Sequence, residues 1–155
     1  MLPPDLINEA RILSQCGVAS KKRLLESLAE LLADADPKLD TETVFERLLE
    51  RERLGSTGLG YGIALPHARA VEVAAPIGAF IQLREAVNFD AIDDQPVDLA
   101  FALLVPQAAD ERHLQLLASL AEMFNNDSLR QRLRASGSSS DLYNLLTRWV
   151  APADA

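Results

Sequence analysis

The segment VDLAFALLV, residues 97–105, is almost entirely apolar and ends at Pro106. A short run of this kind predicts a strand that is buried on both faces. Apolar residues recur at helical spacing before and after it, so helices are expected on either side of this strand. A buried strand with helices on both sides indicates a sheet flanked by helices, and we therefore predict an α/β fold.

Five helices are expected from the apolar spacing and from the residues that can cap them. Ser20 caps the first, which ends before Pro37, and Asp40 or Thr41 caps the second, which runs to about Arg53. The other three follow the buried strand: one is capped by Asp110, one covers about residues 128–135, and one carries the apolar stripe Leu142, Leu145, Leu146 and Trp149.

Shorter apolar runs at residues 63–65 and 77–83 predict two further strands. Residues after Ala151 are expected to be loose. The chain shows no repeat and no second domain, so we predict a single domain over residues 1–155. The pattern in about residues 1–19 is weak, and we interpret this stretch as peripheral, with a short edge strand among Leu6, Ile7, Ile12 and Val18.

The composition limits the possible partners and compartment. A net charge of -8 and a pI near 4.7 disfavour nucleic acid as a partner and suit basic patches on other proteins. No apolar run approaches the ~20 residues of a membrane helix, and the N-terminus lacks the features of a signal peptide. The single cysteine, Cys16, cannot form an internal disulfide, which agrees with a reducing compartment. We therefore predict a cytoplasmic protein without membrane insertion.

The segment RERLGSTGLGYGIALPHAR, residues 51–69, carries the strongest signal for a functional site. Glycines at this density let the backbone turn through positive φ and bring its amides close to a ligand, most often an anion. The predicted phosphate loop consists of Gly55, Ser56, Thr57, Gly58, Gly60 and Gly62.

His67 follows this loop and is one of only two histidines in the chain. An imidazole with its ordinary pKa, about 6.5, is largely neutral and nucleophilic near neutral pH. Pro66 restricts the backbone before it, and Arg51 and Arg69 supply guanidinium groups suited to phosphate oxygens. This combination favours phosphate chemistry at His67 over the alternative, a histidine with a purely structural role.

The second histidine, His113, falls in the first turn of the helix that follows Asp110. The helix dipole disfavours an imidazolium at that position. A neutral His113 can donate one ring N–H to a phosphoryl oxygen. From its position alone, a core histidine bonded to a backbone carbonyl is an equally good interpretation.

Other kinds of site are disfavoured by composition or spacing. Two distant histidines and one cysteine do not form a structural zinc site. The glycine-rich residues 55–62, called the glycine segment below, end in Tyr61 and Gly62 where a nucleotide-binding P-loop needs lysine. Ser56 lies outside any GxSxG nucleophile motif. We interpret Asp90, Asp93, Asp94 and Asp98 as a solvated acidic turn. The alternative is that they form paired catalytic carboxylates.

Residues 51–69 resemble the active-site signature of the mannitol/fructose-type IIA proteins of the bacterial phosphoenolpyruvate phosphotransferase system. The segment FDAIDDQPVDLAFALLVP and the HLQLLASLAEMF helix after it are similar to the nitrogen-regulatory branch of that family. The resemblance extends from about Ser20 to Val150. It implies a single-domain sandwich with a central mixed sheet of about five strands flanked by helices.

The resemblance also implies the chemistry of the site. The family's phosphorylated histidine falls on His67, with Nε2 as the phosphorylated nitrogen, its second active-site histidine falls on His113, and its phosphate-binding arginine falls on Arg51. An HPr-like phosphohistidine carrier would be the donor. Neither a metal nor another cofactor belongs to such a site. The family often has asparagine at the position of Tyr61 and lysine at that of Arg69, and we expect Tyr61 to narrow the donor's approach to the loop.

By resemblance, the chain is a phosphotransferase-system component with a histidine nucleophile. Its phosphorylation state would regulate protein targets, such as potassium-transport or sensor-kinase proteins. One alternative is a sugar-specific IIA component that passes phosphate to a IIB domain for uptake. The other is a binding module of the same fold that is not phosphorylated.

Overall fold

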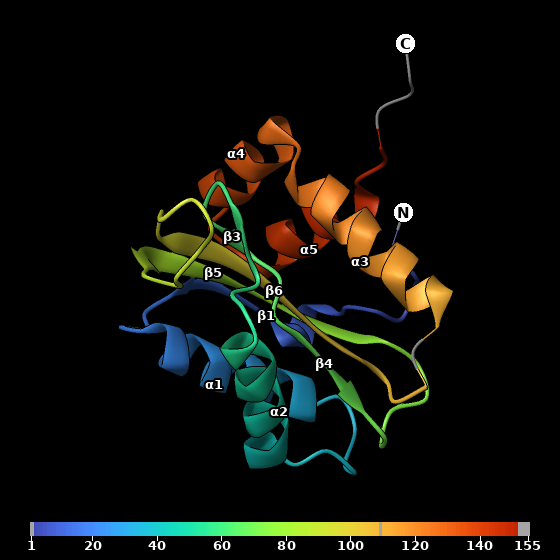
Figure 1. The fold of residues 1–155 in the computed structure, drawn as a ribbon. Coiled ribbons are helices and arrows are strands. Elements are labelled where there is room, and N and C mark those ends of the chain that lie inside the picture. The colour runs from blue at the N-terminus through green and yellow to red at the C-terminus, as the bar shows by residue number, and fades with distance from the viewer. Residues whose placement is uncertain (1, 109, 152–155) are drawn as a thin grey trace.

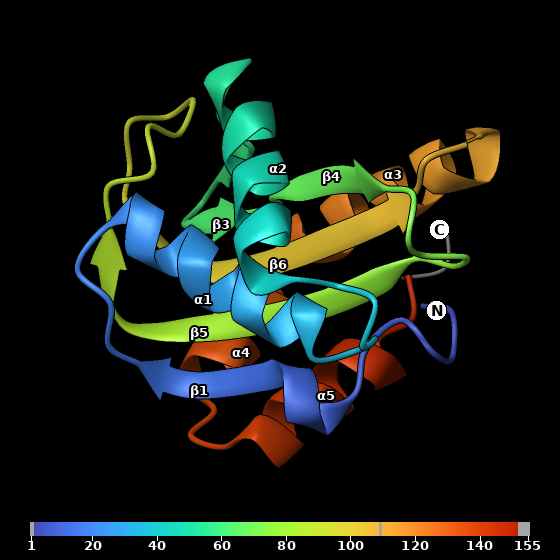
Figure 2. The same cartoon turned by 90° about the horizontal axis from the view of Figure 1, so that it is seen from below.

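The computed structural model describes residues 2–108 and 110–151. A central sheet lies between two layers of helices, as Figure 1 shows. The lower layer contains α1 (Lys21–Ala33) and α2 (Thr41–Arg53), and the upper layer contains α3 (Glu111–Phe124), α4 (Asp127–Ala135) and α5 (Ser139–Arg148). The view from below in Figure 2 has α1 and α2 in front of the sheet and α5 behind it. The predicted α/β sandwich is therefore confirmed.

The sheet has six strands, not about five, in the order β1-β5-β6-β3-β2, with β4 also paired to β6. It is mixed, because β1 runs parallel to β5 while β5 and β6 are antiparallel. The two short strands β2 and β4 were not predicted from the sequence, because glycine and proline obscure the alternation of polar and apolar residues in such short segments. The strands are β1 (Ile12–Cys16), β2 (Gly58–Gly60), β3 (Ile63–Ala64), β4 (His67–Ala70), β5 (Ile77–Val87) and β6 (Val97–Pro106).

Each α-helix begins at a residue whose side chain accepts a hydrogen bond from a backbone N–H of the first turn. The caps predicted at Ser20, at Asp110 and in the serine run before the last helix are therefore confirmed. Of the two candidates for α2, Asp40 is the cap, and the Asn126 cap of α4 was not predicted. The five caps are Ser20, Asp40, Asp110, Asn126 and Ser138.

Strand β6 is the centre of the hydrophobic core, and residues 99–105 are buried as predicted. One of its faces packs with the layer of α1 and α2 through Ala100, Ala102 and Leu104. The other face packs with the layer of α3, α4 and α5 through Leu99, Phe101 and Leu103. The sheet therefore needs both layers of helices to keep it from water.

Part of the N-terminal segment belongs to the core, so the interpretation of residues 1–19 as peripheral does not hold for these residues. Leu6, Ile7 and Ile12 are only 1–2% exposed and pack in the cluster that includes α5. The short edge strand expected there exists as β1. Among the last residues, which were predicted to be loose, Ala151 is exposed, and residues 152–155 lie outside the described part of the chain.

His67 begins the second half of an interrupted strand. β3 and β4 both pair in parallel with β6 in one register, which sets Ile63 opposite Leu99 and His67 opposite Leu103. The pairing breaks at Pro66, which has no N–H to donate to the ladder. The Pro66 carbonyl still accepts from the backbone N–H of Leu103, at 2.9 Å, which keeps His67 beside β6.

Gly62 occupies a position that requires glycine. Its φ is +79°, and an added Cβ would clash with Nη2 of Arg134 and lie 2.8 Å from Oδ1 of Asp98. We predict that Gly62→Ala lowers the free energy of unfolding by about 1–3 kcal/mol, because the backbone is strained and the Arg134–Asp98 ion pair is displaced. Urea unfolding measures this loss. Gly137→Ala is the control, since no atom lies within 4 Å of its added Cβ. Equal losses in the two variants would contradict the prediction.

Candidate functional site

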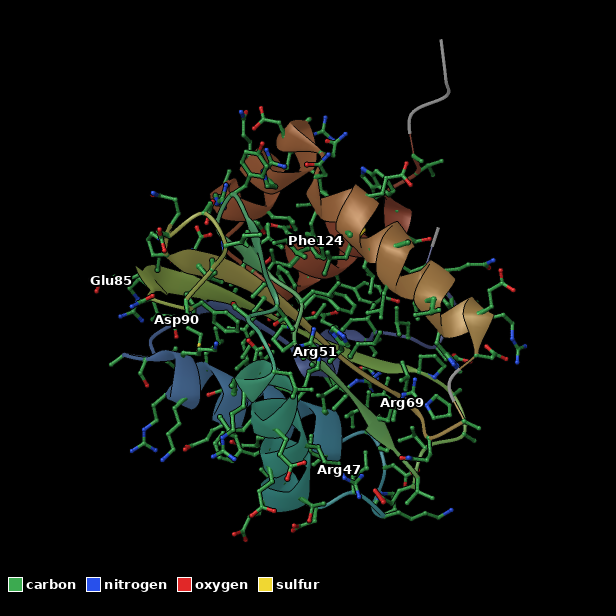
Figure 3. All side chains as sticks on the ribbon, in the orientation of Figure 1. Arg47, Arg51, Arg69, Glu85, Asp90 and Phe124 are labelled. Carbon is green, nitrogen blue, oxygen red and sulfur yellow. The ribbon has the colours of Figure 1, made fainter. Side chains whose placement is uncertain are left out.

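A cavity of about 830 Å³ opens where α2, β4 and the start of α3 meet. Its lining brings together four residues predicted from separate parts of the sequence, along with other charged residues and several apolar ones. Figure 3 shows two of its arginines, Arg51 and Arg69, on the same side of the molecule. The predicted residues on the wall are Arg51, His67, Arg69 and His113, and the apolar residues are Leu54, Val105, Leu114 and Leu117.

The ring of His67 is half-buried and held at one nitrogen. Its Nδ1 lies 2.8 Å from the carbonyl oxygen of Leu65. A carbonyl only accepts hydrogen bonds, so Nδ1 carries the proton. In the neutral ring, Nε2 therefore keeps its lone pair, and it is the nitrogen able to act as a nucleophile.

The pKa of His67 is lowered from its ordinary value. Burial is the main cause, because it disfavours the charged form, and the positive charge of Arg51 acts in the same direction. The Leu65 carbonyl and the charge of Glu52 oppose the shift. The net effect keeps the ring neutral near pH 7, as nucleophilic chemistry at His67 requires.

His113 is held in the opposite orientation. Its Nδ1 accepts a 3.0 Å hydrogen bond from the backbone N–H of Asp110, while the Asp110 side chain caps α3. Only a nitrogen with a lone pair can accept this bond, so the proton of the neutral ring is on Nε2. The Asp110 carboxylate is 3.6 Å from the same nitrogen, too far for a hydrogen bond. Among the described residues no carbonyl is bonded to the ring of His113, so the alternative of a core histidine bonded to a carbonyl is not supported there.

The arginines of the cavity have different roles. Arg47 forms a two-pronged ion pair with Glu72, at 2.8 and 3.1 Å, which ties α2 to the turn after β4. Arg51 uses one N–H to donate to the Gly55 carbonyl, at 2.9 Å. Within residues 2–108 and 110–151, neither Arg51 nor Arg69 forms an ion pair, so both retain charge for an anion.

Three amides of the glycine segment, which were expected to face an anion, are hydrogen-bonded within the protein. The N–H of Thr57 donates to Glu52, that of Gly58 to Ser56, and that of Gly55 to the Glu52 carbonyl. Only two predicted loop residues, Ser56 and Thr57, line a hollow shared with His67. The predicted residues that line neither this hollow nor the larger cavity are Gly55, Gly58, Gly60 and Gly62.

Tyr61, which was expected to narrow the donor's approach to the loop, lines neither of the two hollows that contain His67. It lies in the turn between β2 and β3, is 63% exposed, and stacks over the guanidinium of Arg130 at 4.4 Å. It lines a separate hollow beside the C-terminal half of α3. Asp90, Asp93 and Asp94 are exposed, as predicted for a solvated acidic turn. Asp98 is instead half-buried and forms an ion pair with Arg134 at 2.9 Å.

Two features of the site were missed by the sequence analysis. Glu52 is buried behind the cavity, although its place in a charged helix end gave no sign of this. The rim carries exposed leucines, with Leu54 85% and Leu114 67% exposed. In the sequence, such exposed leucines are indicated only by a leucine that follows charged residues at a helix end.

No group of three or more metal-ligating side chains that could hold an ion occurs among the described residues. In the same part of the chain, no helix is both long and apolar enough to cross a bilayer.

Comparison with known proteins places this geometry in a family. Residues 5–149 match the family described as phosphoenolpyruvate-dependent sugar phosphotransferase system, EIIA 2. A nitrogen regulatory protein of Pseudomonas aeruginosa is 45% identical over 142 residues, which cover 92% of each chain.

Two solved structures are similar along most of their length. The nitrogen regulatory protein IIA-Ntr of Neisseria meningitidis has a TM-score of 0.86 and 43% identity, over 91% of this chain and 96% of that one. The mannitol enzyme IIA of Escherichia coli was solved in complex with phosphorylated mannitol enzyme IIB. It has a TM-score of 0.75 and 26% identity, over 91% of this chain and 96% of that one.

We predict that His67 titrates below the ordinary histidine pKa, because burial and Arg51 both disfavour the imidazolium. The neutral ring should therefore persist as the pH falls below about 6.5, the unperturbed value. NMR titration of the imidazole measures the pKa directly. Arg51→Gln should raise it, because the variant lacks the guanidinium charge. A pKa at or above the ordinary value in the unmodified chain would contradict the prediction.

Proposed function

Because the chain belongs to the EIIA 2 family of the phosphoenolpyruvate-dependent sugar phosphotransferase system, we propose that it is a phosphocarrier that accepts a phosphoryl group on Nε2 of His67. Its phosphorylation state then regulates other proteins. The observation that carries this proposal is the hydrogen bond from Nδ1 of His67 to the Leu65 carbonyl. It leaves Nε2 with a lone pair beside a cavity that Arg51 and His113 also line.

The donor is a phosphohistidine on an HPr-like carrier, protonated at its other ring nitrogen. The lone pair of Nε2 of His67 attacks the phosphorus in line, and the phosphorus–nitrogen bond of the donor breaks. The electron pair of that bond stays on the donor ring, which leaves as a neutral imidazole. On His67 the product is a phosphoimidazolium whose Nδ1–H stays bonded to the Leu65 carbonyl. No proton has to move between the partners.

Positive charge and one N–H donor stabilise the transferred group. Charge in the transition state spreads over the three equatorial oxygens of the phosphoryl group. Arg51 and Arg69 offer guanidinium N–H groups, and His113 offers Nε2–H, so catalysis consists mainly of positioning and electrostatics. The carboxylates of Glu50 and Glu111 also line the cavity and suit a carrier with a basic surface.

Regulation follows from the change in charge. A phosphoryl group adds about -1.5 to -2 charges at the cavity and so changes which protein surfaces fit there. The relatives named nitrogen regulatory protein, at 43–45% identity, favour this output. Potassium-transport or sensor-kinase proteins are candidate targets, by family resemblance.

The second candidate function is a sugar-specific IIA component. The observation in its favour is the 26% identical mannitol enzyme IIA, which was solved with phosphorylated IIB. The higher identity to the nitrogen regulatory proteins argues against it. Mixing the phosphorylated chain with mannitol- and fructose-type IIB domains distinguishes the two, since efficient transfer to a IIB domain would favour the sugar-specific function.

We expect one phosphoryl group on the chain after incubation with phosphoenolpyruvate, the first enzyme of the system and an HPr-like carrier. Intact mass measurement detects it, and omission of the carrier is the control. His67→Ala should remain unmodified, because it lacks the nucleophile. A phosphoryl mass on His67→Ala would show that another residue is the acceptor, and an unmodified natural chain would favour the binding module.

Arg51→Ala and His113→Ala should each slow phosphoryl acceptance by about 10- to 1,000-fold, as expected when one group that stabilises transition-state charge is lost. Both variants should keep the fold, because neither side chain is part of the hydrophobic core. Rapid-quench kinetics with the phosphorylated carrier measures the rate. Arg53→Ala is the matched control, since Arg53 is exposed in the same helix turn as Arg51 and lines neither cavity. Unchanged rates in both test variants would refute these roles.

A further inference from the structure

A carboxylate is buried directly behind the site. Glu52 follows Arg51 in α2, but its side chain is only 2% exposed and lines neither of the cavities that contain His67. A buried carboxylate costs free energy unless its oxygens are paired and hydrogen-bonded. Its partners therefore indicate what it does.

Both oxygens of Glu52 bind the start of the glycine segment. The backbone N–H of Thr57 donates to Oε1 at 3.1 Å and to Oε2 at 3.3 Å, and the Thr57 hydroxyl also donates to Oε2. Lys21 of α1 forms an ion pair with Oε1 at 3.1 Å, while its ammonium group lies over the ring of Phe89 at 4.4 Å. One carboxylate thus joins α1, α2 and the glycine segment.

A line of hydrogen bonds leads from this carboxylate to the nucleophile. The Thr57 carbonyl accepts from the backbone N–H of Leu65 at 3.0 Å. The Leu65 carbonyl then accepts from Nδ1 of His67 at 2.8 Å. The carboxylate therefore fixes Thr57, Thr57 fixes Leu65, and Leu65 fixes the tautomer of His67. In catalytic triads a carboxylate bonds directly to the histidine and sets its tautomer; here two backbone segments lie between them.

We propose that Glu52 is a positioning residue for phosphoryl transfer, which it serves by holding the Leu65 carbonyl under Nδ1 of His67. The proposal rests on the proposed function of His67 as phosphoryl acceptor. Without the carboxylate, Thr57 loses its anchor and the Leu65 carbonyl can shift. Both tautomers of His67 then become populated, and the fraction with a lone pair on Nε2 falls.

The test compares Glu52→Gln with Glu46→Gln in the full chain. Glu46 is exposed on α2, so this control removes the same charge without touching the glycine segment. Heteronuclear NMR of the imidazole nitrogens reports the tautomer of His67. In Glu52→Gln we expect a mixture of tautomers, and in Glu46→Gln the Nδ1–H form alone.

Kinetics with a phosphorylated HPr-like carrier give the second readout. We expect kcat for Glu52→Gln to fall by about 10- to 100-fold, the loss typical of a misplaced reacting group. KM for the carrier should stay constant, because Glu52 does not line the cavity. If kcat and the tautomer are both unchanged, the proposal is overturned. It is also overturned if kcat falls while His67 keeps the Nδ1–H form, because the loss then has another cause.

Thr57→Val keeps the proposal testable if Glu52→Gln does not fold. Valine preserves the shape and the backbone N–H but removes the hydroxyl bond to Glu52. In Thr57→Val, kcat should fall and both tautomers of His67 should appear, to a smaller extent than in Glu52→Gln. If kcat and the tautomer are both unchanged, the proposal is overturned. The tautomer measurement needs no donor. If the natural chain accepts no phosphoryl group, the proposed function fails, while NMR still decides whether Glu52 sets the His67 tautomer.

Discussion

The pairing of β6 on both of its edges is the constraint on which the rest of the structure depends. β5 pairs with one edge of β6, and the interrupted strand formed by β3 and β4 pairs with the other edge. Because both faces of β6 are apolar, helices must cover each face. α2 therefore lies below the sheet and α3 above it (Figure 1). Arg51 comes from one layer and His113 from the other, and they meet at His67 on the strand between them.

The backbone determines the protonation pattern of the site. A carbonyl accepts from Nδ1 of His67, and an N–H donates to Nδ1 of His113. The two neutral rings therefore have opposite tautomers, one with a lone pair on Nε2 and the other with an N–H there. The same kind of side chain therefore presents a lone pair at one position of the cavity and an N–H at the other. Burial supports this arrangement at His67, where it lowers the pKa and disfavours the imidazolium.

Much of the fold and the main site residues could be predicted from local patterns. The helices, their caps and the buried strand follow from apolar spacing and capping chemistry, and His67 stands out by its glycine-rich, arginine-flanked context. The role of the glycine segment could not be predicted. Glycine content shows that a backbone can turn, but whether its amides stay open for an anion depends on neighbours such as Glu52, whose burial is a tertiary property.

By itself, the sequence determined the α/β class, the helix starts and the kinds of side chain in the candidate site, because each depends on residues near one another in the chain. The tertiary structure alone decided how Arg51, His67 and His113 meet, which nitrogen of each ring carries the proton, and that Leu6 and Ile7 belong to the core. The physical reason is that burial and hydrogen-bond partners come from segments distant in sequence, and no local pattern encodes them.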